Sequence, residues 1–281
     1  MKPVIKRLIT GLIYIVVISM AVLLKKPSLY VAVFSLMIMI AIMEFCRLAK
    51  NNRTRPLRSI LDGIAGAYLF SVSLISAVSG FERILFAPYI FYIIYIMVRA
   101  IYSEVKGLPQ ELSRTVLGQI YIAGGMSLAN FILFSSTPAT ASFDQARSTL
   151  LFFIFVIIWM NDTGAYIIGS SFGKKRLFPS LSPLKSWEGF WGGLVFSMIS
   201  AAIFGHFFIE IDKPLYIWVI LGALISVGAT WGDLFESSLK RNAGVKDSGR
   251  MLPGHGGMLD RIDSILFAIP VAYIGFILFG I

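Results

Sequence analysis

Two aspartates near the end of the chain have the spacing of a metal-binding pair. Asp260 and Asp263 stand three positions apart just before an apolar run, so a helix beginning there carries both carboxylates on one face. Oxygen ligands without Cys or clustered His suit Mg²⁺, which commonly bridges to substrate phosphates. Asp233 ends the preceding apolar run and is predicted to add a third carboxylate, because a charge near hydrocarbon is costly unless it binds something. The alternative is that Asp260, Arg261 and Asp263 only cap the helix start.

The segment between these acids mixes basic residues with glycines. Glycine lets backbone N–H groups approach a ligand, and Lys and Arg pair with phosphate. The residues are Lys240, Arg241, Lys246, Arg250, Gly244, Gly249, Gly254, Gly256 and Gly257. Anchoring at the membrane surface would explain the basic residues alone, but not the mixture. A metal beside a phosphate cradle indicates phosphoryl or nucleotidyl transfer.

A second polar segment, residues 161–193, interrupts the apolar pattern. Its polar residues are Asn161, Asp162, Lys174, Lys175, Arg176, Ser182, Lys185, Ser186 and Glu188. Polar side chains at membrane depth indicate function, although the sequence assigns no role to Asn161, Asp162 or Glu188. Interspersed apolar residues, among them Leu184 and Trp187, predict a segment at the membrane interface, where a lipid headgroup lies. A solvated loop is the alternative.

Composition predicts an all-α polytopic membrane protein. The chain of 281 residues is 57% hydrophobic and 14% charged, with mean hydropathy +0.80, more apolar surface than a soluble domain of this length can bury. Long continuous apolar runs favour helices over barrel strands. We predict about nine transmembrane helices, at 8–24, 28–46, 59–79, 84–101, 116–135, 148–170, 189–209, 214–235 and 262–281.

The basic residues predict the orientation of these spans. If the connections alternate between two sides, 20 of the 25 Lys and Arg residues fall on the side of the N-terminus. The positive-inside rule makes that side cytoplasmic and puts the C-terminus on the opposite side. The net charge of +10 thus fits lipid headgroups rather than nucleic acid. Glu44 and Asp62, near cytoplasmic helix ends, are expected to pair with arginines of residues 47–58.

The spans predict two regions. Residues 1–147 form a five-helix transmembrane region, and residues 148–281 form a catalytic four-helix region. The second region carries two cytoplasmic polar loops, at 171–188 and 236–261. An even number of spans separates these loops, so they face the same side and can build one site.

The segment SLKRNAGVKDSGRMLPGHGGMLDRID, residues 238–263, resembles the signature of the phosphatidate cytidylyltransferases, or CDP-diacylglycerol synthases. The matching positions are Ser238, Lys240, Arg241, Lys246, Asp247, Pro253, His255, Gly256, Gly257, Asp260, Arg261 and Asp263. The stretch GAYIIGSSFGKKRLFPSLSPLKSWEGFWGG is similar to the second block of the family, with Lys185-Ser186 in its serine form. The two blocks span the C-terminal two-fifths of the chain.

This resemblance implies transfer of CMP from CTP to phosphatidic acid, with release of pyrophosphate, in a bacterial-type cytoplasmic membrane. It also implies Mg²⁺ dependence, a second cation such as K⁺, and a homodimer. Together with the residue chemistry it assigns Asp233, Asp260 and Asp263 to the metal, Lys240, Arg241 and Lys246 to the triphosphate, and Ser182 and Lys185 to the lipid phosphate. Catalytic roles are expected for Asp233, Lys240, Asp260 and Asp263. Contacts with substrate are expected from Ser238, Asp247, His255, Gly256, Gly257 and Arg261.

Two rival functions fit part of the pattern. A CTP-dependent lipid or polyprenol kinase would release CDP instead of pyrophosphate. A transporter would carry polar residues through the middle of several spans, whereas here the charges gather at helix ends on one side.

Overall fold

The computed structural model describes residues 3–48, 56–79, 82–102, 108–134, 147–249 and 256–281. The structure of these ranges is almost entirely helical. Its helices are α1 (Pro3–Leu23), α2 (Pro27–Leu48), α3 (Pro56–Ser79), η1 (Arg83–Phe86), α4 (Ala87–Ile101), α5 (Leu108–Gly118), η2 (Gln119–Gly124), α6 (Gly125–Leu133), α7 (Ser148–Phe172), α8 (Trp187–Phe208), α9 (Leu215–Asn242) and α10 (Leu259–Phe279). Three of them begin at a proline, whose missing N–H costs nothing at a helix start.

Eight of the described helical segments are long and apolar enough to cross a membrane, and α1 adds a shorter apolar stretch at Thr10–Leu23. Many large apolar side chains on them are exposed, as expected of surfaces that face lipid. The predicted all-α polytopic membrane fold is confirmed. The sides on which the two termini lie remain a prediction.

The chain divides into two compact units. The first comprises Met1–Ala146 together with Asp247–Leu259, and the second comprises Arg147–Lys246 together with Asp260–Ile281. The described residues of the glycine-rich segment at 247–249 and 256–259 thus pack with the N-terminal helices. The basic segment before it and the acids after it belong to the second unit.

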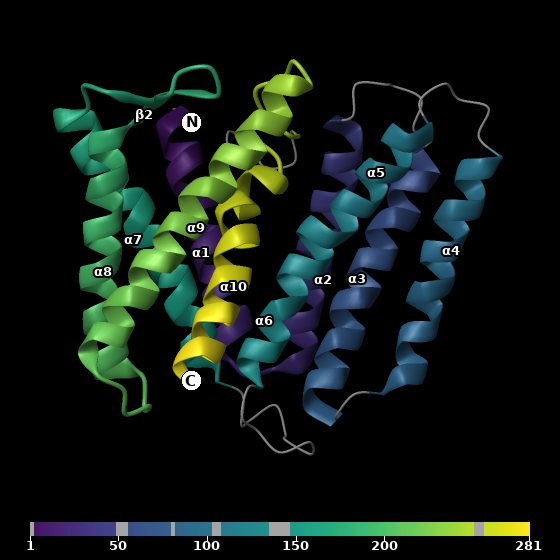
Figure 1. Cartoon of the computed structure of the whole chain (residues 1–281), viewed down its shortest axis with the longest axis horizontal. Helices are drawn as coiled ribbons and strands as arrows, with labels where there is room; N and C mark the ends of the chain where they lie inside the picture. The colour runs from purple at the N-terminus through teal and green to yellow at the C-terminus, as the bar shows by residue number, and fades with distance from the viewer. Residues whose placement is uncertain (1–2, 49–55, 80–81, 103–107, 135–146, 250–255) are drawn as a thin grey trace. The chain divides into compact units, whose positions relative to one another are not determined.

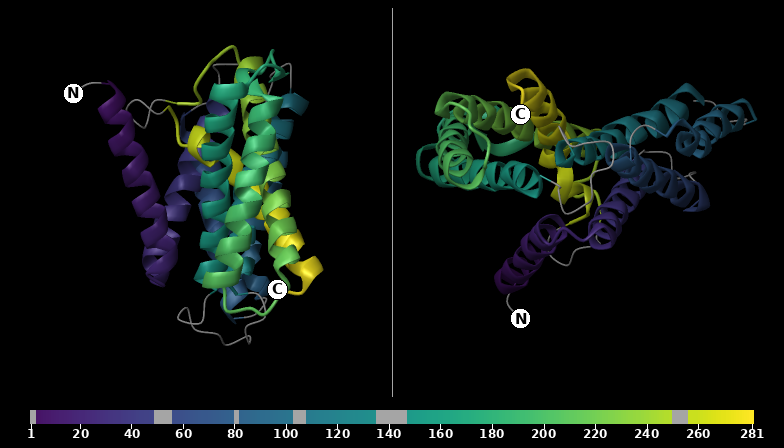
Figure 2. Two further views of the ribbon diagram at one scale, coloured as in Figure 1. Left: turned by 90° about the vertical axis from the view of Figure 1, so that its left-hand side faces the viewer. Right: turned by 90° about the horizontal axis from the view of Figure 1, so that it is seen from below.

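The second unit is a bundle of α7, α8, α9 and α10 with a small hairpin at one end (Figures 1 and 2). The hairpin pairs β1 (Arg176–Phe178) with β2 (Ser182–Ser186) in antiparallel fashion. The sequence pattern did not predict these strands, because they are too short to show an alternation of apolar and polar residues. The Ser186 hydroxyl accepts the backbone N–H of Gly189 at 3.1 Å and caps α8. The hairpin therefore ends where α8 begins, which fixes the position of Lys185.

Close helix approaches bring the polar ends of this bundle together. Between α7 and α8, a Cβ at Gly192 would lie 3.0 Å from the Gly164 carbonyl oxygen. Between α9 and α10, a Cβ at Gly232 would lie 2.5 Å from the Asp263 carbonyl oxygen. Small residues let membrane helices approach in this way. As a result, the end of α9 that carries Asp233 lies against the start of α10 that carries Asp263.

The first unit contains a π-helical segment, η2, inside its fifth apolar span. Its first residue, Gln119, donates through Nε2 to the backbone carbonyl of Asp62 on α3 at 2.7 Å. The Asp62 carboxylate accepts the Tyr92 hydroxyl at 2.8 Å and has Arg99 at 3.8 Å. The sequence predicted arginine partners for Asp62 among residues 47–58. The structure gives its carboxylate partners on α4, namely Tyr92 and Arg99.

Candidate active site

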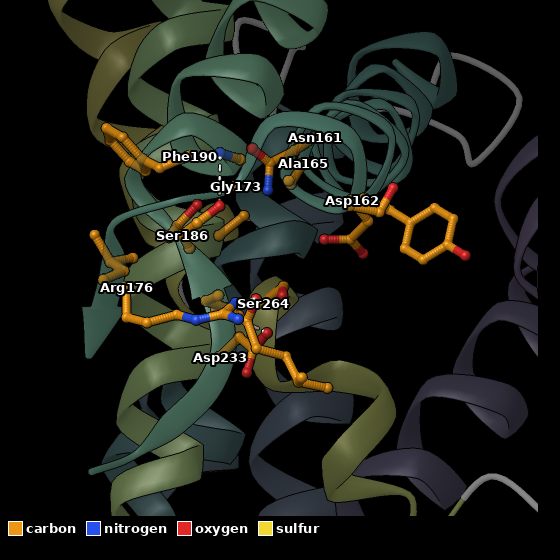
Figure 3. Close-up of a pocket in the computed structure, with 18 residues that line it drawn as sticks. Asn161, Asp162, Ala165, Gly173, Arg176, Ser186, Phe190, Asp233 and Ser264 are labelled. Atoms are coloured by element: carbon orange, nitrogen blue, oxygen red, sulfur yellow. Dashed lines mark hydrogen bonds and ion pairs between the residues drawn. The ribbon is translucent and has the colours of Figure 1, made fainter. Parts of the chain in front are cut away.

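A cavity of about 500 Å³ opens in the second unit, among α7, α8, α9, α10 and the hairpin (Figure 3). Polar side chains from four of these elements line it: Asn161, Asp162, Ser170, Arg176, Lys185, Ser186, Thr230, Asp233 and Ser264. Leu177, Leu184 and Phe190 add apolar surface. A cavity with both kinds of lining suits a ligand that has a polar and an apolar part.

An excess of acidic groups surrounds one lysine beside this cavity. The Lys185 ammonium, from β2, forms an ion pair with the Asp233 carboxylate on α9. Asp263 on α10 lies within electrostatic range of Asp233, Asp162 and Lys185, and Asp162 on α7 interacts with the same partners. Three carboxylates thus share the Lys185 ammonium and the Arg261 guanidinium, so negative charge is in excess. Repulsion among like charges in a partly buried site favours a bound cation.

Asn161 holds the neighbouring part of α7 in place. Its side-chain oxygen accepts the Ser226 hydroxyl of α9 at 2.7 Å, and both residues are buried. Asp162 is the next residue and lines the cavity. The hydrogen bond between α7 and α9 therefore fixes the position of α7 along α9 and keeps Asp162 within electrostatic range of Asp233.

A second acidic cluster lies around Lys240, about two turns beyond Asp233 along α9. The Lys240 ammonium is 2.7 Å from Asp260 Oδ1 and 2.5 Å from Glu236 Oε2. Glu236 is fully buried and also interacts electrostatically with Asp263. The two clusters are therefore electrostatically coupled, so a change of charge in one cluster alters the electrostatic energy of the other.

The three predicted metal ligands fall into these two clusters. Asp233 and Asp263 lie together, joined by Asp162, while Asp260 faces Lys240. Among the described residues, no three acidic, His or Cys side chains are arranged as a ready-made metal site. In this structure the counter-charge of Asp233 is the Lys185 ammonium, and that of Asp260 is the Lys240 ammonium. Their role as metal ligands remains a prediction.

Arg241 and Arg261, two further predicted substrate contacts, also have partners in the structure. The Arg241 guanidinium donates to the Leu181 carbonyl at 3.2 Å and to the Val245 carbonyl at 3.0 Å. It thereby fastens the turn of the hairpin to the end of α9. Arg261 lies within electrostatic range of Asp162.

The other predicted substrate contacts differ in solvent exposure and are divided between the two units. Ser182 begins β2 and is partly buried, as is Ser238 on α9, while Lys246 is exposed. In the first unit, Asp247 is exposed and Gly257 is buried. Gly256 has φ +83°, in the left-handed region that favours glycine. His255 lies outside the described residues.

Sequence reasoning gave no role to Asp162 and did not single out Glu236. Glu236 stands three residues after Asp233 and four before Lys240, a spacing that puts all three on one helix face. This spacing could have identified it. Only the contact between α7 and α9 brings Asp162 to the same site, and the sequence carries no signal for that contact.

Comparison with known proteins supports the resemblance seen in the two motifs. The model of the "Cytidylyltransferase family" matches residues 5–279. The phosphatidate cytidylyltransferase of Bacillus subtilis (strain 168) is 33% identical over 284 residues, covering 98% of each chain. Its namesake from Staphylococcus aureus (strain COL) is 46% identical over 134 residues, covering 46% of this chain and 50% of that one.

The Staphylococcus saprophyticus phosphatidate cytidylyltransferase is also 46% identical, over 121 residues that cover 43% of this chain and 46% of that one. The family predicted from the motifs is confirmed, and the match reaches the N-terminal helices, where the motifs are absent. The chain belongs to the cytidylyltransferase family.

Proposed function

We propose that the chain transfers the cytidylyl group of CTP to phosphatidic acid, forming CDP-diacylglycerol and pyrophosphate. The observation that carries this proposal is the excess of carboxylates around Lys185 at a cavity in a membrane-spanning bundle. Membership of the cytidylyltransferase family and relatives named phosphatidate cytidylyltransferase support it. Such a site suits a reaction between two polyanions, which must be neutralised and aligned before they can meet.

The reaction needs little acid–base chemistry. A phosphate oxygen of phosphatidic acid, already anionic at neutral pH, attacks the α-phosphorus of CTP. The bond from that phosphorus to the bridging oxygen breaks, and pyrophosphate leaves with the electron pair. We assign the lipid phosphate to Lys185, which lines the cavity, since a phosphate can replace Asp233 as the partner of its ammonium. Lys240 and Arg241 at the end of α9 are assigned to the phosphates of CTP.

The donor set fits Mg²⁺. Asp233, Asp263 and Asp162 offer hard oxygen ligands in mutual electrostatic range, the type that Mg²⁺ prefers. We assign the metal to Asp233 and Asp263 first, and Asp260 to the adjacent Lys240 cluster. When bound, the ion would supply charge neutralisation at the phosphates. A second cation such as K⁺ and a homodimer remain part of the proposal through the family resemblance alone.

We place the enzyme in the bacterial cytoplasmic membrane with its site on the cytoplasmic side, where CTP is available. The bias of basic residues toward one side of the predicted spans supports this orientation. Labelling an engineered cysteine at either chain end from one side of sealed vesicles tests it. Reaction of a C-terminal cysteine only from the cytoplasmic side would contradict the orientation.

The function is tested with CTP radiolabelled at either the α- or the γ-phosphate. Purified protein is mixed with vesicles that contain phosphatidic acid and with Mg²⁺, and the lipid and the soluble products are separated. We expect the α-label in the lipid and the γ-label in pyrophosphate. Label from the γ-position in the lipid, with release of CDP, would instead identify a lipid kinase.

The matched pair of variants for this assay is Asp263→Asn and Asp212→Asn. Asp263 belongs to the acidic cluster, whereas Asp212 is exposed in the connection between α8 and α9. We expect loss of product only in Asp263→Asn. Equal activity in both variants would remove the acidic cluster from the reaction.

A further inference from the structure

Glu44 on α2 is a buried acid in the first unit that the proposed mechanism does not use. Only 3% of it is exposed. Its Oε2 accepts the Ser248 hydroxyl at 3.0 Å and the Leu259 backbone N–H at 2.9 Å. One carboxylate oxygen therefore joins both ends of the segment 248–259, which contains the Pro-x-His-Gly-Gly part of the family motif. The sequence had suggested an arginine partner for Glu44, but these two donors are uncharged.

Two glycines of the same segment close around this carboxylate. A Cβ at Gly249 would lie 2.3 Å from Glu44 Oε1, and a Cβ at Gly257 would lie 2.3 Å from Oε2. Both distances are far below van der Waals contact, so any side chain at either position displaces the carboxylate or the backbone. Gly257 of the motif is therefore explained by its approach to Glu44.

The bond to Leu259 also caps a helix. Leu259 is the first residue of α10, and its N–H is one of the donors that a helix start leaves without an intrahelical partner. A carboxylate at this end also interacts favourably with the helix dipole. Asp260 follows directly in the chain and Asp263 lies within the first turns. Glu44 thus helps to define where α10 begins, and with it the helical position of both acids.

From these contacts we infer that Glu44 is a positioning residue, which holds residues 248–249 and 257–259, the last of which begins α10, in the conformation that binds the phosphates of CTP. The inference rests on the proposed function for the identity of the ligand. The positioning itself rests only on the contacts of Glu44 within the first unit.

Asp62 provides a matched control, because it is also 3% exposed and lies in the same unit. Its carboxylate contacts Tyr92, Cys46 and Arg99, all of them on helices outside the segment 248–259. Substitution of Asp62 therefore disturbs a buried carboxylate whose described contacts all lie outside the segment. Glu82, which is exposed, serves as a second control.

The first experiment measures hydrogen exchange of peptides that cover residues 244–262 in the full-length protein in lipid nanodiscs. In Glu44→Gln and Glu44→Ala we expect exchange at this segment to be faster by about tenfold or more, since a hydrogen bond to a charged group is lost. Asp62→Asn and Glu82→Gln should leave exchange there at the wild-type rate. Unchanged exchange in Glu44→Gln, or an equal increase in Asp62→Asn, would overturn the inference.

Kinetics of the same variants separate positioning from general damage. We expect Glu44→Gln to raise the KM for CTP by about tenfold with a smaller change in kcat, and Glu44→Asp to retain more activity. If Glu44→Ala does not fold, Glu44→Gln and Glu44→Asp carry the test. If the wild-type protein forms no product from CTP and phosphatidic acid, the proposed function fails, while hydrogen exchange still decides the role of Glu44.

A double-mutant cycle tests the contact directly. Gly257→Ala should lose activity, because its Cβ meets Glu44 Oε2. Glu44→Asp shortens the acid by one methylene and should restore part of that activity in the double variant. The control is Gly232→Ala, whose Cβ would meet the Asp263 carbonyl instead, and Glu44→Asp should not rescue it. Additive effects of Gly257→Ala and Glu44→Asp would contradict the inference.

Discussion

The two units each place acidic side chains within the apolar bundle, but they balance the charge differently. Asp62 in the first unit is matched by Arg99 and by the hydroxyl of Tyr92. Asp162, Asp233 and Asp263 in the second unit share Lys185 and Arg261 beside a cavity of about 500 Å³. Depth of burial therefore does not mark the acids of the candidate site, because Asp62 is the most deeply buried of these four acids.

The difference teaches how to tell a structural acid from a functional one in this protein. A carboxylate whose partners are all supplied by neighbouring helices stabilises the fold and needs nothing more. A cluster with more negative than positive groups, open to a cavity, is costly until a ligand brings positive charge. The predictions below test this contrast, in order of decreasing effect.

The largest effect is expected for Asp233→Asn and Asp263→Asn. Each should lower the rate of pyrophosphate release by about a hundredfold to a thousandfold, as for loss of one preorganised electrostatic contact with the transition state. Thermal stability should not fall, because one of several repelling carboxylates is removed. The measurement is pyrophosphate release per folded molecule beside the melting temperature. A variant that melts early and keeps its rate would reverse the assignment.

Lys240→Met should be the most destabilising change at the site. It leaves Glu236 and Asp260 buried without their shared ammonium, which costs about 3–5 kcal/mol of unfolding free energy. Denaturant titration measures this loss. The double variant Lys240→Met with Glu236→Gln should recover part of the stability, and failure to recover would show that the Glu236 charge is not the cause.

Mg²⁺ should stabilise the protein through the acidic cluster of Asp162, Asp233 and Asp263, and not through Asp62. At a concentration a hundred times its Kd, the ion should add about 2.7 kcal/mol to the wild-type protein, measured as a rise in melting temperature without CTP. Asp233→Asn should lose most of this gain, whereas Asp62→Asn should keep it. Equal stabilisation of both variants would place the metal elsewhere.

The smallest effect is expected for Asp62→Asn. It weakens the hydrogen bond with Tyr92 and should cost about 1–3 kcal/mol of unfolding free energy. Activity per folded molecule should stay at the wild-type level, because Asp62 lies outside the cavity. A loss of activity without a loss of stability would contradict the interpretation of Asp62 as a structural acid and would indicate a functional role.

Much of the fold could be predicted from local features. Apolar runs of sufficient length predicted the helical spans, and the three-residue spacing of Asp260 and Asp263 placed both in the first turns of α10. Helix starts were less accurate: the last span was predicted from residue 262, while α10 begins at Leu259. Hydropathy does not register a first turn that contains acids, so such boundaries are missed.

The candidate site was only partly predictable. The motifs identified Lys185, Asp233 and Asp263 as separate candidates, but their meeting depends on the hairpin and on the close approach of α9 and α10 at Gly232. Asp162 on α7 lies within electrostatic range of Asp263, whereas Asp260 forms an ion pair with Lys240. No spacing within one segment encodes a contact between segments.

The sequence by itself determined the class of fold, the family and the chemical character of the site, because hydropathy, the motifs and the charges are properties of local stretches. Only the tertiary structure decided which charges pair: Lys185 with Asp233, and Lys240 with Glu236 and Asp260. It also decided that Glu44 meets Ser248 and Leu259, far along the chain. The physical reason is that charge pairing and helix capping act over a few ångströms in space, whatever the separation in sequence.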